Sequence, residues 1–290
     1  YIMKIAMICT THNRMDKTRC CLNSIKNQRN THSVSYDIYI CDDNSTDGTF
    51  EMIQNEYKHV YLCQGNGDLF WTRGMAKAME SVSYIDSYDA FLMINDDVEF
   101  DLEMLDIMYE NFVKHSKESP VCIVGPTRSK IDGTWTYGGH KLLKNRSKEK
   151  MNPVDPSDKD LQCQVAGWNC FLLPISIYEA VGQLDTAYEH AMGDFDYCRR
   201  MCKEGYKIYS ADAYIGFCES NPIENTWRDT NLSLCERLVK LEKKTGLPWK
   251  SRAHYDFKYF GLIWGLRRFL QPYFTIFRDS LLRYKNEGKI

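Results

Sequence analysis

The chain has 290 residues, 43% of them hydrophobic, and a formal net charge of −2 at pH 7. A chain of this length can bury a full hydrophobic core, and we expect one main domain with an appendage. The near-neutral charge gives no general reason to expect a nucleic acid or another polyanion as partner. The twelve cysteines are scattered, mostly within apolar runs, and no Cys-x-x-Cys pair occurs. We therefore expect buried free thiols rather than disulfides or a zinc site.

Strand-like apolar runs alternate with helical patterns in the first half of the chain. We predict strands over residues 4–9, 36–41, 60–63, 90–95 and 121–125, and helices over 17–28, 50–57, 73–83 and 103–116. This alternation is typical of right-handed βαβ units, which build a mostly parallel sheet flanked by helices. The first residues run directly into an apolar strand without a secretory signal, so we expect a cytoplasmic protein.

The second half begins with a polar stretch, residues 140–160, whose lysines and prolines indicate a mobile surface loop. An apolar run over 165–173 resumes the core, and residues 194–204 have a helical pattern. Together with the first half, these elements predict an α/β fold.

The segment 257–285 is rich in Trp, Tyr, Phe and Arg, and its charges and Pro272 interrupt it too often for a transmembrane helix. Its composition suits the membrane–water interface, so one interpretation is peripheral docking on the anionic inner face of the cell membrane. The residues that favour docking are Tyr259, Trp264, Tyr273, Arg267, Arg268, Arg278 and Arg283. The alternative is a helical pair that caps the core or forms a homodimer contact.

Two acidic clusters follow apolar runs about one α/β unit apart. Residues 42–49 read Asp-Asp-Asn-Ser-Thr-Asp-Gly-Thr, and the second cluster is Asn95-Asp96-Asp97. Carboxylates at the carboxyl ends of neighbouring buried strands face the crevice where open α/β sheets bind ligands. A phosphorylated ligand beside this much negative charge would need a divalent cation between. Taken alone, the composition of the loop 42–49 favours a turn and helix N-cap, and only the other motifs make ligand binding the preferred interpretation.

A third acidic cluster, Gly193-Asp194-Phe195-Asp196-Tyr197, lies far downstream and could supply a base. A metal, a diphosphate and a base together suggest the transfer of a group from a nucleotide-activated donor.

Four motifs, taken in order, resemble those of family 2 glycosyltransferases with the GT-A fold. They are Thr10-Thr11-His12-Asn13-Arg14, the loop 42–49, the Asn-Asp-Asp strand end, and Gly-Asp-Phe-Asp-Tyr-Cys-Arg-Arg from Gly193. The resemblance covers residues 4 to about 216 and is greatest to bacterial enzymes that build surface polysaccharides, rhamnosyltransferase-like ones among them. It implies a GT-A catalytic domain over 1–216, with a nucleotide-binding half (1–97) and an acceptor half (98–216). A C-terminal helical segment, 217–290, would follow.

The resemblance also implies roles for single residues. Asp43 would accept the imide hydrogen of a uracil or thymine base, and Asp97 would bind the Mn²⁺ or Mg²⁺ that bridges the two donor phosphates. Asp194 would be the catalytic base of an inverting transfer. Further candidates for binding the donor nucleotide are Thr10, His12, Arg14, Arg73 and Asp96, and candidates for the acceptor or for support are Trp71, Trp168, Asp196 and Arg199.

The chain departs from the family pattern at the expected metal-binding histidine, because no histidine occurs between His190 and His254. Cys218 or Glu219 would have to substitute, unless water fills the position or metal dependence is weak. Cys218 is a soft ligand and therefore a poor choice for Mg²⁺.

These observations favour a metal-dependent glycosyltransferase. It would move a sugar from a nucleotide-diphosphate donor, with UDP or dTDP preferred, to a glycan or lipid-linked oligosaccharide. One alternative is a non-catalytic protein that binds a nucleotide sugar, although such a protein would have no use for the base. The other is a sugar-phosphate nucleotidyltransferase, which would need a basic glycine-rich loop after the first strand.

Overall fold

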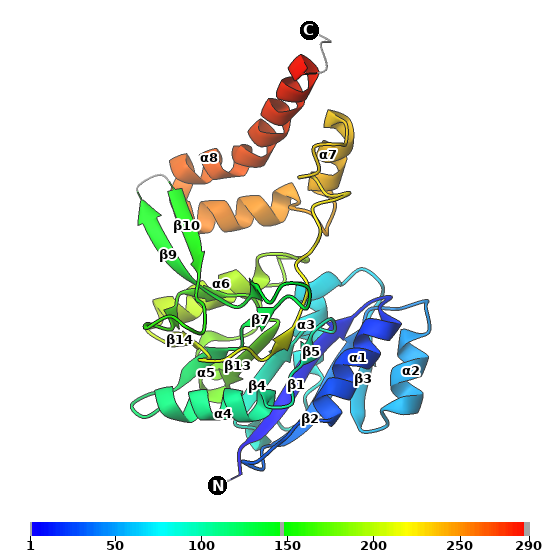
Figure 1. The fold of residues 1–290 in the computed structure, drawn as a ribbon, viewed down its shortest axis with the longest axis vertical. Coiled ribbons are helices and arrows are strands. Elements are labelled where there is room, and N and C mark those ends of the chain that lie inside the picture. The colour runs from blue at the N-terminus through cyan, green and yellow to red at the C-terminus, as the bar shows by residue number, and fades with distance from the viewer. Residues whose placement is uncertain (1, 146–147, 287–290) are drawn as a thin grey trace. The chain divides into compact units, whose positions relative to one another are not determined.

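The computed structural model describes residues 2–145 and 148–286 (Figure 1). The chain forms two compact units. The first comprises Tyr1–Thr186 and Gly193–Ser220, and the second comprises Ala187–Met192 and Asn221–Ile290.

The first unit is built on a sheet that has eight strands within the described residues. Their bounds are β1 (Lys4–Thr11), β2 (Ser35–Asp42), β3 (Val60–Gln64), β4 (Ala90–Ile94), β6 (Val121–Val124), β11 (Gln162–Cys163), β13 (Cys170–Pro174) and β14 (Lys207–Ser210). The spatial order is β11-β14-β6-β13-β4-β1-β2-β3. Strands β3, β2, β1 and β4 pair in parallel, whereas β13 is antiparallel to both β4 and β6. The prediction of a mostly parallel sheet is confirmed.

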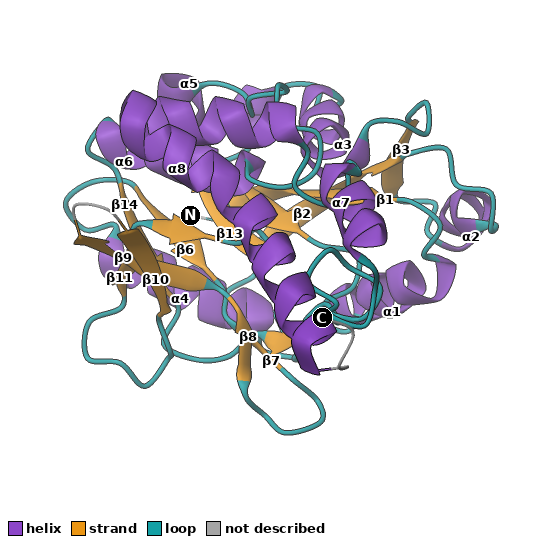
Figure 2. Ribbon diagram, turned by 90° about the horizontal axis from the view of Figure 1, so that it is seen from above, coloured by secondary structure: helices purple, strands orange, loops and turns teal. Residues whose placement is uncertain are grey.

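Helices cover both faces of this sheet, as Figure 2 shows. One face carries α1 (Met15–Lys26), α2 (Thr49–Glu56) and α4 (Met104–His115). The other carries α3 (Phe70–Glu80), α5 (Ile175–Val181) and α6 (Gly193–Lys203), and a short 3₁₀ turn, η1 (Ile85–Ser87), follows α3. The helices predicted from periodicity are therefore present, with ends shifted by a few residues.

Burial on both faces explains why the strands appear in the sequence as continuous apolar runs. In β1, Ile5 and Met7 belong to the core under α1, α2 and α4, whereas Ala6 and Ile8 belong to the core under α3, α5 and α6. Successive side chains of a strand point to opposite faces, so one strand supplies both cores.

The prediction of a mobile loop over 140–160 is wrong. Strands β9 (Gly139–Asn145) and β10 (Lys148–Pro153) form an antiparallel hairpin there, and β9 also pairs with β12 (Val165–Ala166). Leu142 packs against the core and Val154 is fully buried. The prolines that suggested a loop come at and after the end of β10, which is an edge strand, and sheets tolerate proline there.

A third, smaller sheet completes the first unit. It has the order β5 (Glu99–Phe100), β15 (Gly216–Phe217), β7 (Thr127–Arg128) and β8 (Trp135–Tyr137).

The second unit contains α7 (Leu234–Glu242) and α8 (Trp249–Asn286). Ser233 and Glu236 form a reciprocal capping box at the start of α7. Gly261 has a left-handed backbone (φ 68) and breaks α8 into two helices. In residues 2–145 and 148–286, no helix combines the length and apolar character needed to cross a bilayer.

Candidate active site

The first βα turn is held in place by the acidic loop that follows β2. Asn13 adopts a left-handed backbone (φ 52), and its N–H donates to Ser45 Oγ over 2.8 Å. Met15 N–H donates to Asp47 Oδ2 over 3.0 Å at the start of α1. These contacts fix the backbone on both sides of Arg14. Part of the loop 42–49 thus works as a turn and cap, the alternative that its composition suggested.

Thr10 and His12 lie in the same turn and bond to the backbone of β2 and its loop. Thr10 Oγ1 donates to the carbonyl of Cys41 (3.0 Å), and His12 Nδ1 donates to the carbonyl of Asp43 (2.6 Å). A Cβ on Gly74 would lie 2.2 Å from Thr10 Oγ1, so only glycine lets α3 approach β1 this closely. The predicted contacts of Thr10 and His12 with a donor nucleotide stay predictions.

The Asp43 carboxylate is buried and organises the glycine-rich loop that precedes α3. Its Oδ1 accepts the N–H of Gly67 (2.8 Å), and its Oδ2 accepts those of Leu69 (2.9 Å) and Phe70 (3.1 Å). Phe70 has a left-handed backbone (φ 58), which is costly for a bulky residue and is held by this carboxylate. The structure thus gives Asp43 a positioning role that the sequence did not suggest, and its predicted contact with a base stays a prediction.

Asp96 and Asp97 follow β4 and share one cation, the Arg14 guanidinium. Arg14 Nη1 lies 2.7 Å from Asp97 Oδ2 and 3.2 Å from Asp96 Oδ1. Burial and the neighbouring Asp97 raise the pKa of Asp96 to about 6, although Arg14 lowers it. Thr18 Oγ1 donates to Asp96 Oδ2 over 3.4 Å. Sequence analysis predicted that Arg14 and Asp96 bind the donor nucleotide, and the structure brings the two together as an ion pair.

The donor atoms at this place suit a divalent cation, although they do not form a closed metal site. Two adjacent carboxylates converge on a single positive charge, and Mg²⁺ is typically held by one or two carboxylates together with substrate phosphates. Among the described residues, no group of three or more His, Cys, Asp and Glu side chains could hold a metal. Cys218, one of the two residues that could substitute for the expected histidine, donates its Sγ–H to Asp97 Oδ1 over 3.7 Å.

Two tryptophans connect this acidic pair to the downstream motif. Trp71 Nε1 donates to Asn95 Oδ1 over 2.8 Å, which gives the asparagine of the Asn-Asp-Asp motif a specific partner. The Trp71 ring meets the Trp168 ring edge to face, with centroids 6.1 Å apart. Trp168 is fully buried and packs on Phe171, so it belongs to the core. Its predicted acceptor contact stays a prediction.

Asp194 lies in the first turn of α6, beside the backbone of Trp168. Burial raises the pKa of Asp194 to about 6, while hydrogen bonds from the backbone of Phe195, Asp194 and Trp168 lower it. Phe195 N–H lies 2.8 Å from Asp194 Oδ1. A Cβ on Gly193 would come within 2.6 Å of the buried Thr72 side chain, so glycine allows α6 to begin against α3. A half-buried carboxyl with a pKa near neutrality suits a general base.

The remaining candidates from this motif form ion pairs with other residues of the protein. Asp196 is fully buried and pairs with Arg200 over 3.0 Å. Arg200 also donates to the carbonyls of Val181 and Gln183, which follow each other closely at the end of α5. The predicted accessory role of Asp196 stays a prediction.

Arg199 pairs with Glu149 of β10, and both side chains are largely buried. Sequence analysis missed Glu149, because it had assigned its segment to a loop. Arg73 Nε donates to the carbonyl of Thr186 over 3.0 Å, and its predicted phosphate contact stays a prediction.

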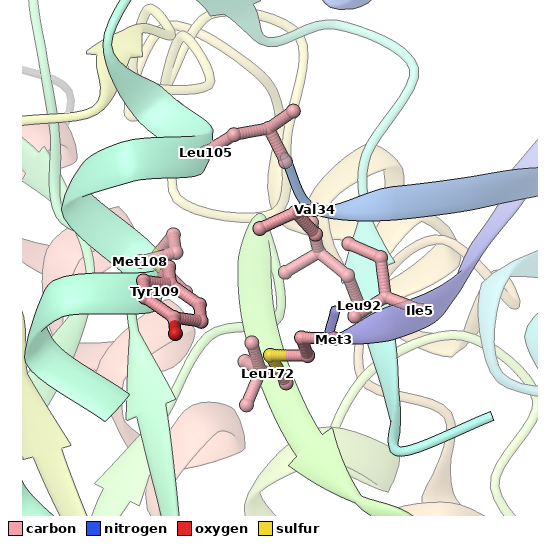
Figure 3. Close-up of a pocket in the computed structure, with 8 residues that line it drawn as sticks. All are labelled: Met3, Ile5, Val34, Leu92, Leu105, Met108, Tyr109 and Leu172. Carbon is pink, nitrogen blue, oxygen red and sulfur yellow. The ribbon is translucent and has the colours of Figure 1, made fainter. Parts of the chain in front are cut away.

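A small cavity elsewhere in the first unit is apolar and does not contribute to this site. Figure 3 shows its lining of Met3, Ile5, Val34, Leu92, Leu105, Met108, Tyr109 and Leu172. It lies between α4 and the sheet, near the amino ends of β1 and β2. The lining offers no charged group to a nucleotide or a sugar.

Comparisons with known proteins agree with the geometry. The family model described as glycosyl transferase family 2 matches residues 7–175. Among solved structures, the chain is similar to S. aureus TarS 1–349, with a TM-score of 0.51 and 13% identity over 93% of this chain and 72% of that one. No curated protein matches the chain. The matched segment spans more than half of the chain and contains the second half of β1, both early acidic motifs and most strands of the sheet that carries them, in the α/β arrangement of the GT-A fold. The protein belongs to glycosyl transferase family 2.

Proposed function

We propose that this protein transfers a sugar, with inversion, from a nucleotide-diphosphate donor to a glycan acceptor, and that Asp194 is the base. The observation that carries the proposal is the connection of the Asp96–Asp97 pair to Asp194 through Asn95, Trp71 and Trp168. The same region would then contain the Asp96–Asp97 pair, for a charged leaving group, and separately the Asp194 carboxyl, which ionises near neutral pH. An inverting transfer needs both.

In the proposed reaction, Asp194 and the Asp96–Asp97 pair have different roles. Asp194 would take the proton of the acceptor hydroxyl as its oxygen attacks the anomeric carbon opposite the leaving phosphate. Asp97, with Asp96 beside it, would hold the Mn²⁺ or Mg²⁺ expected from the family, which neutralises charge on the departing nucleoside diphosphate. UDP and dTDP are the proposed donor nucleotides. The proposed acceptor is a glycan or a lipid-linked oligosaccharide, because the resemblance is greatest to family members that build polysaccharides.

The test is a comparison of Asp194→Asn with the wild type, measuring both transfer and binding of UDP or dTDP. Removing the base should abolish transfer and leave nucleotide affinity nearly unchanged, since the base acts on the transition state alone. A variant that keeps more than a small fraction of wild-type turnover would exclude Asp194 as the base. Nucleotide binding without any transfer by the wild-type protein would favour the non-catalytic alternative.

We also propose that the second half of α8 docks on a membrane surface. Its exposed face carries Ile263, Leu266, Phe274, Phe277 and Leu281. Successive positions are three or four residues apart, except for the interval of eight residues between Leu266 and Phe274. All of these spacings return to the same side of a helix, so the five residues form one apolar stripe. A stripe of large apolar residues exposed over this length is unusual on a monomer and marks an interaction surface.

The charges beside the stripe favour a bilayer over a second copy of the helix. Within Leu262–Tyr284, Asp279 is the only acid and is already paired with Arg278 and Arg237. Two copies would bring like charges together, whereas an anionic lipid surface complements them. Arg268 pairs with Asp256, and Arg283 donates to backbone carbonyls of residues 230–232. Because these two arginines already have partners within the protein, we expect apolar contact to contribute more to membrane binding than the number of arginines suggests.

Vesicle co-sedimentation tests the docking surface. Ile263→Glu/Phe274→Glu should lose binding to anionic vesicles, whereas Val239→Glu, at an exposed apolar position of α7, should retain it. Equal behaviour of the wild type and the double variant would refute the proposal. A loss of dimer in the double variant, measured by light scattering, would assign the stripe to a homodimer instead.

A further inference from the structure

Arg14 occupies the place that a divalent cation would take on the acidic pair. One nitrogen, Nη1, contacts both Asp97 Oδ2 (2.7 Å) and Asp96 Oδ1 (3.2 Å). The Arg14 side chain is 40% exposed, against 8% and 18% for the two aspartates. A metal bound to these carboxylate oxygens would therefore compete with the guanidinium, because two cations at contact distance repel each other.

The backbone of Arg14 is fixed, so only its side chain can make this move. Arg14 N–H lies 3.3 Å from Thr49 Oγ1, and its neighbours Asn13 and Met15 are held by Ser45 and Asp47. The guanidinium still has N–H groups beyond the Nη1 contacts, and its exposure leaves them accessible to a ligand. A diphosphate would offer these groups charged oxygens at least as favourable as those of the aspartates.

We propose that Arg14 is a built-in counter-ion that makes metal binding conditional on the diphosphate. The inference rests on the proposed nucleotide-diphosphate donor. Without the nucleotide, Arg14 neutralises part of the charge on Asp96 and Asp97 and keeps a divalent cation out. With the nucleotide, the guanidinium moves to the phosphates and releases the carboxylate oxygens to the metal. Arg14 is thus a positioning residue for the donor complex.

The test measures Mn²⁺ binding directly, by electron paramagnetic resonance of the free ion, without any turnover. The proteins are the wild type, Arg14→Gln, Arg14→Lys and the control Arg19→Gln, each with and without UDP or dTDP. Arg19 lies on α1, which begins directly after Arg14, and pairs with Glu56 at the surface. In the absence of nucleotide, we expect Arg14→Gln to bind Mn²⁺ about tenfold or more tightly than the wild type, since a competing charge is removed. Arg14→Lys, which keeps the charge, should behave like the wild type, as should Arg19→Gln.

Adding the nucleotide should raise the Mn²⁺ affinity of the wild type strongly and that of Arg14→Gln much less. Equal Mn²⁺ affinity of the wild type and Arg14→Gln without nucleotide would overturn the inference, provided that thermal melting shows Arg14→Gln to be folded. If that variant is not folded, tight Mn²⁺ binding to wild-type or Arg14→Lys protein without nucleotide would overturn it equally. The failure of every variant to bind UDP or dTDP would count against the proposed donor and not against the competition between Arg14 and Mn²⁺.

Discussion

Asp194→Asn should stabilise the protein at neutral pH while it abolishes transfer. Burial holds the pKa of Asp194 at about 6, above its ordinary value of 3.8. The folded state therefore favours the protonated carboxyl. This contribution is fully present below about pH 4 and is lost as the pH rises through about 6.

At pH 7.5 the wild type carries a charged carboxylate in a partly desolvated place. A pKa difference of one corresponds to about 1.4 kcal/mol, so the cost is about 1–3 kcal/mol. Asparagine has no charge to desolvate, and its side-chain oxygen can still accept the N–H of Phe195.

Urea denaturation at about pH 4.5 and pH 7.5 measures the effect. The variant should exceed the wild type in free energy of unfolding by about 1–3 kcal/mol at the higher pH, and by about a third of that at the lower one, where the unfolded state is already largely ionised. Asp196→Asn is the matched control on the same helix turn. It breaks a buried ion pair with Arg200, and should cost about 3–5 kcal/mol. Equal stability of Asp194→Asn and the wild type at both pH values would refute the assignment of a desolvated carboxyl to Asp194.

Three further predictions concern the site. The rate of transfer at low substrate should rise with pH through about 6 as Asp194 ionises, and a profile that is flat between about pH 5 and 7.5 would contradict this. Gly193→Ala should lower kcat by about tenfold or more, because its Cβ would lie 2.6 Å from the Thr72 side chain and displace the start of α6; Thr72→Ala in the same chain should restore part of the loss, and no restoration would count against this clash. Asp97→Ala should lose the Mn²⁺-dependent part of its UDP or dTDP affinity in calorimetry, and an unchanged affinity would count against a metal at Asp97.

Local patterns were sufficient to predict the parallel part of the fold. Strands β1, β2 and β4 are buried on both faces, so their apolar runs stand out between amphipathic helices. The hairpin β9–β10 was missed because its polar, lysine-rich strands are short of apolar residues. Their pairing is set by tertiary contacts such as those of Leu142 and Val154, which local propensity does not record.

The sequence indicated which residues are candidates for the site, but not which residues they contact. The sequence singled out Arg14, Asp96, Asp97 and Asp194 as functional candidates. That Arg14 pairs with residues more than eighty positions away, or that Trp168 contacts Asp194 through its backbone, depends on how β1, β4 and α6 come together. The partners of the Asp43 carboxylate could not be predicted for the same reason, because its three amide donors come from the segment that follows another strand, β3.

The most direct test of the central claim is a transfer assay with a panel of UDP- and dTDP-sugars and glycan acceptors, run on the wild type and Asp194→Asn in the presence of Mn²⁺. The wild type should release nucleoside diphosphate and form a glycoside of inverted anomeric configuration with at least one donor. Asp194→Asn should bind that donor's nucleotide with similar affinity and form no product. A product of retained configuration, or full turnover by the variant, would contradict the role of Asp194 as the base of an inverting glycosyltransferase.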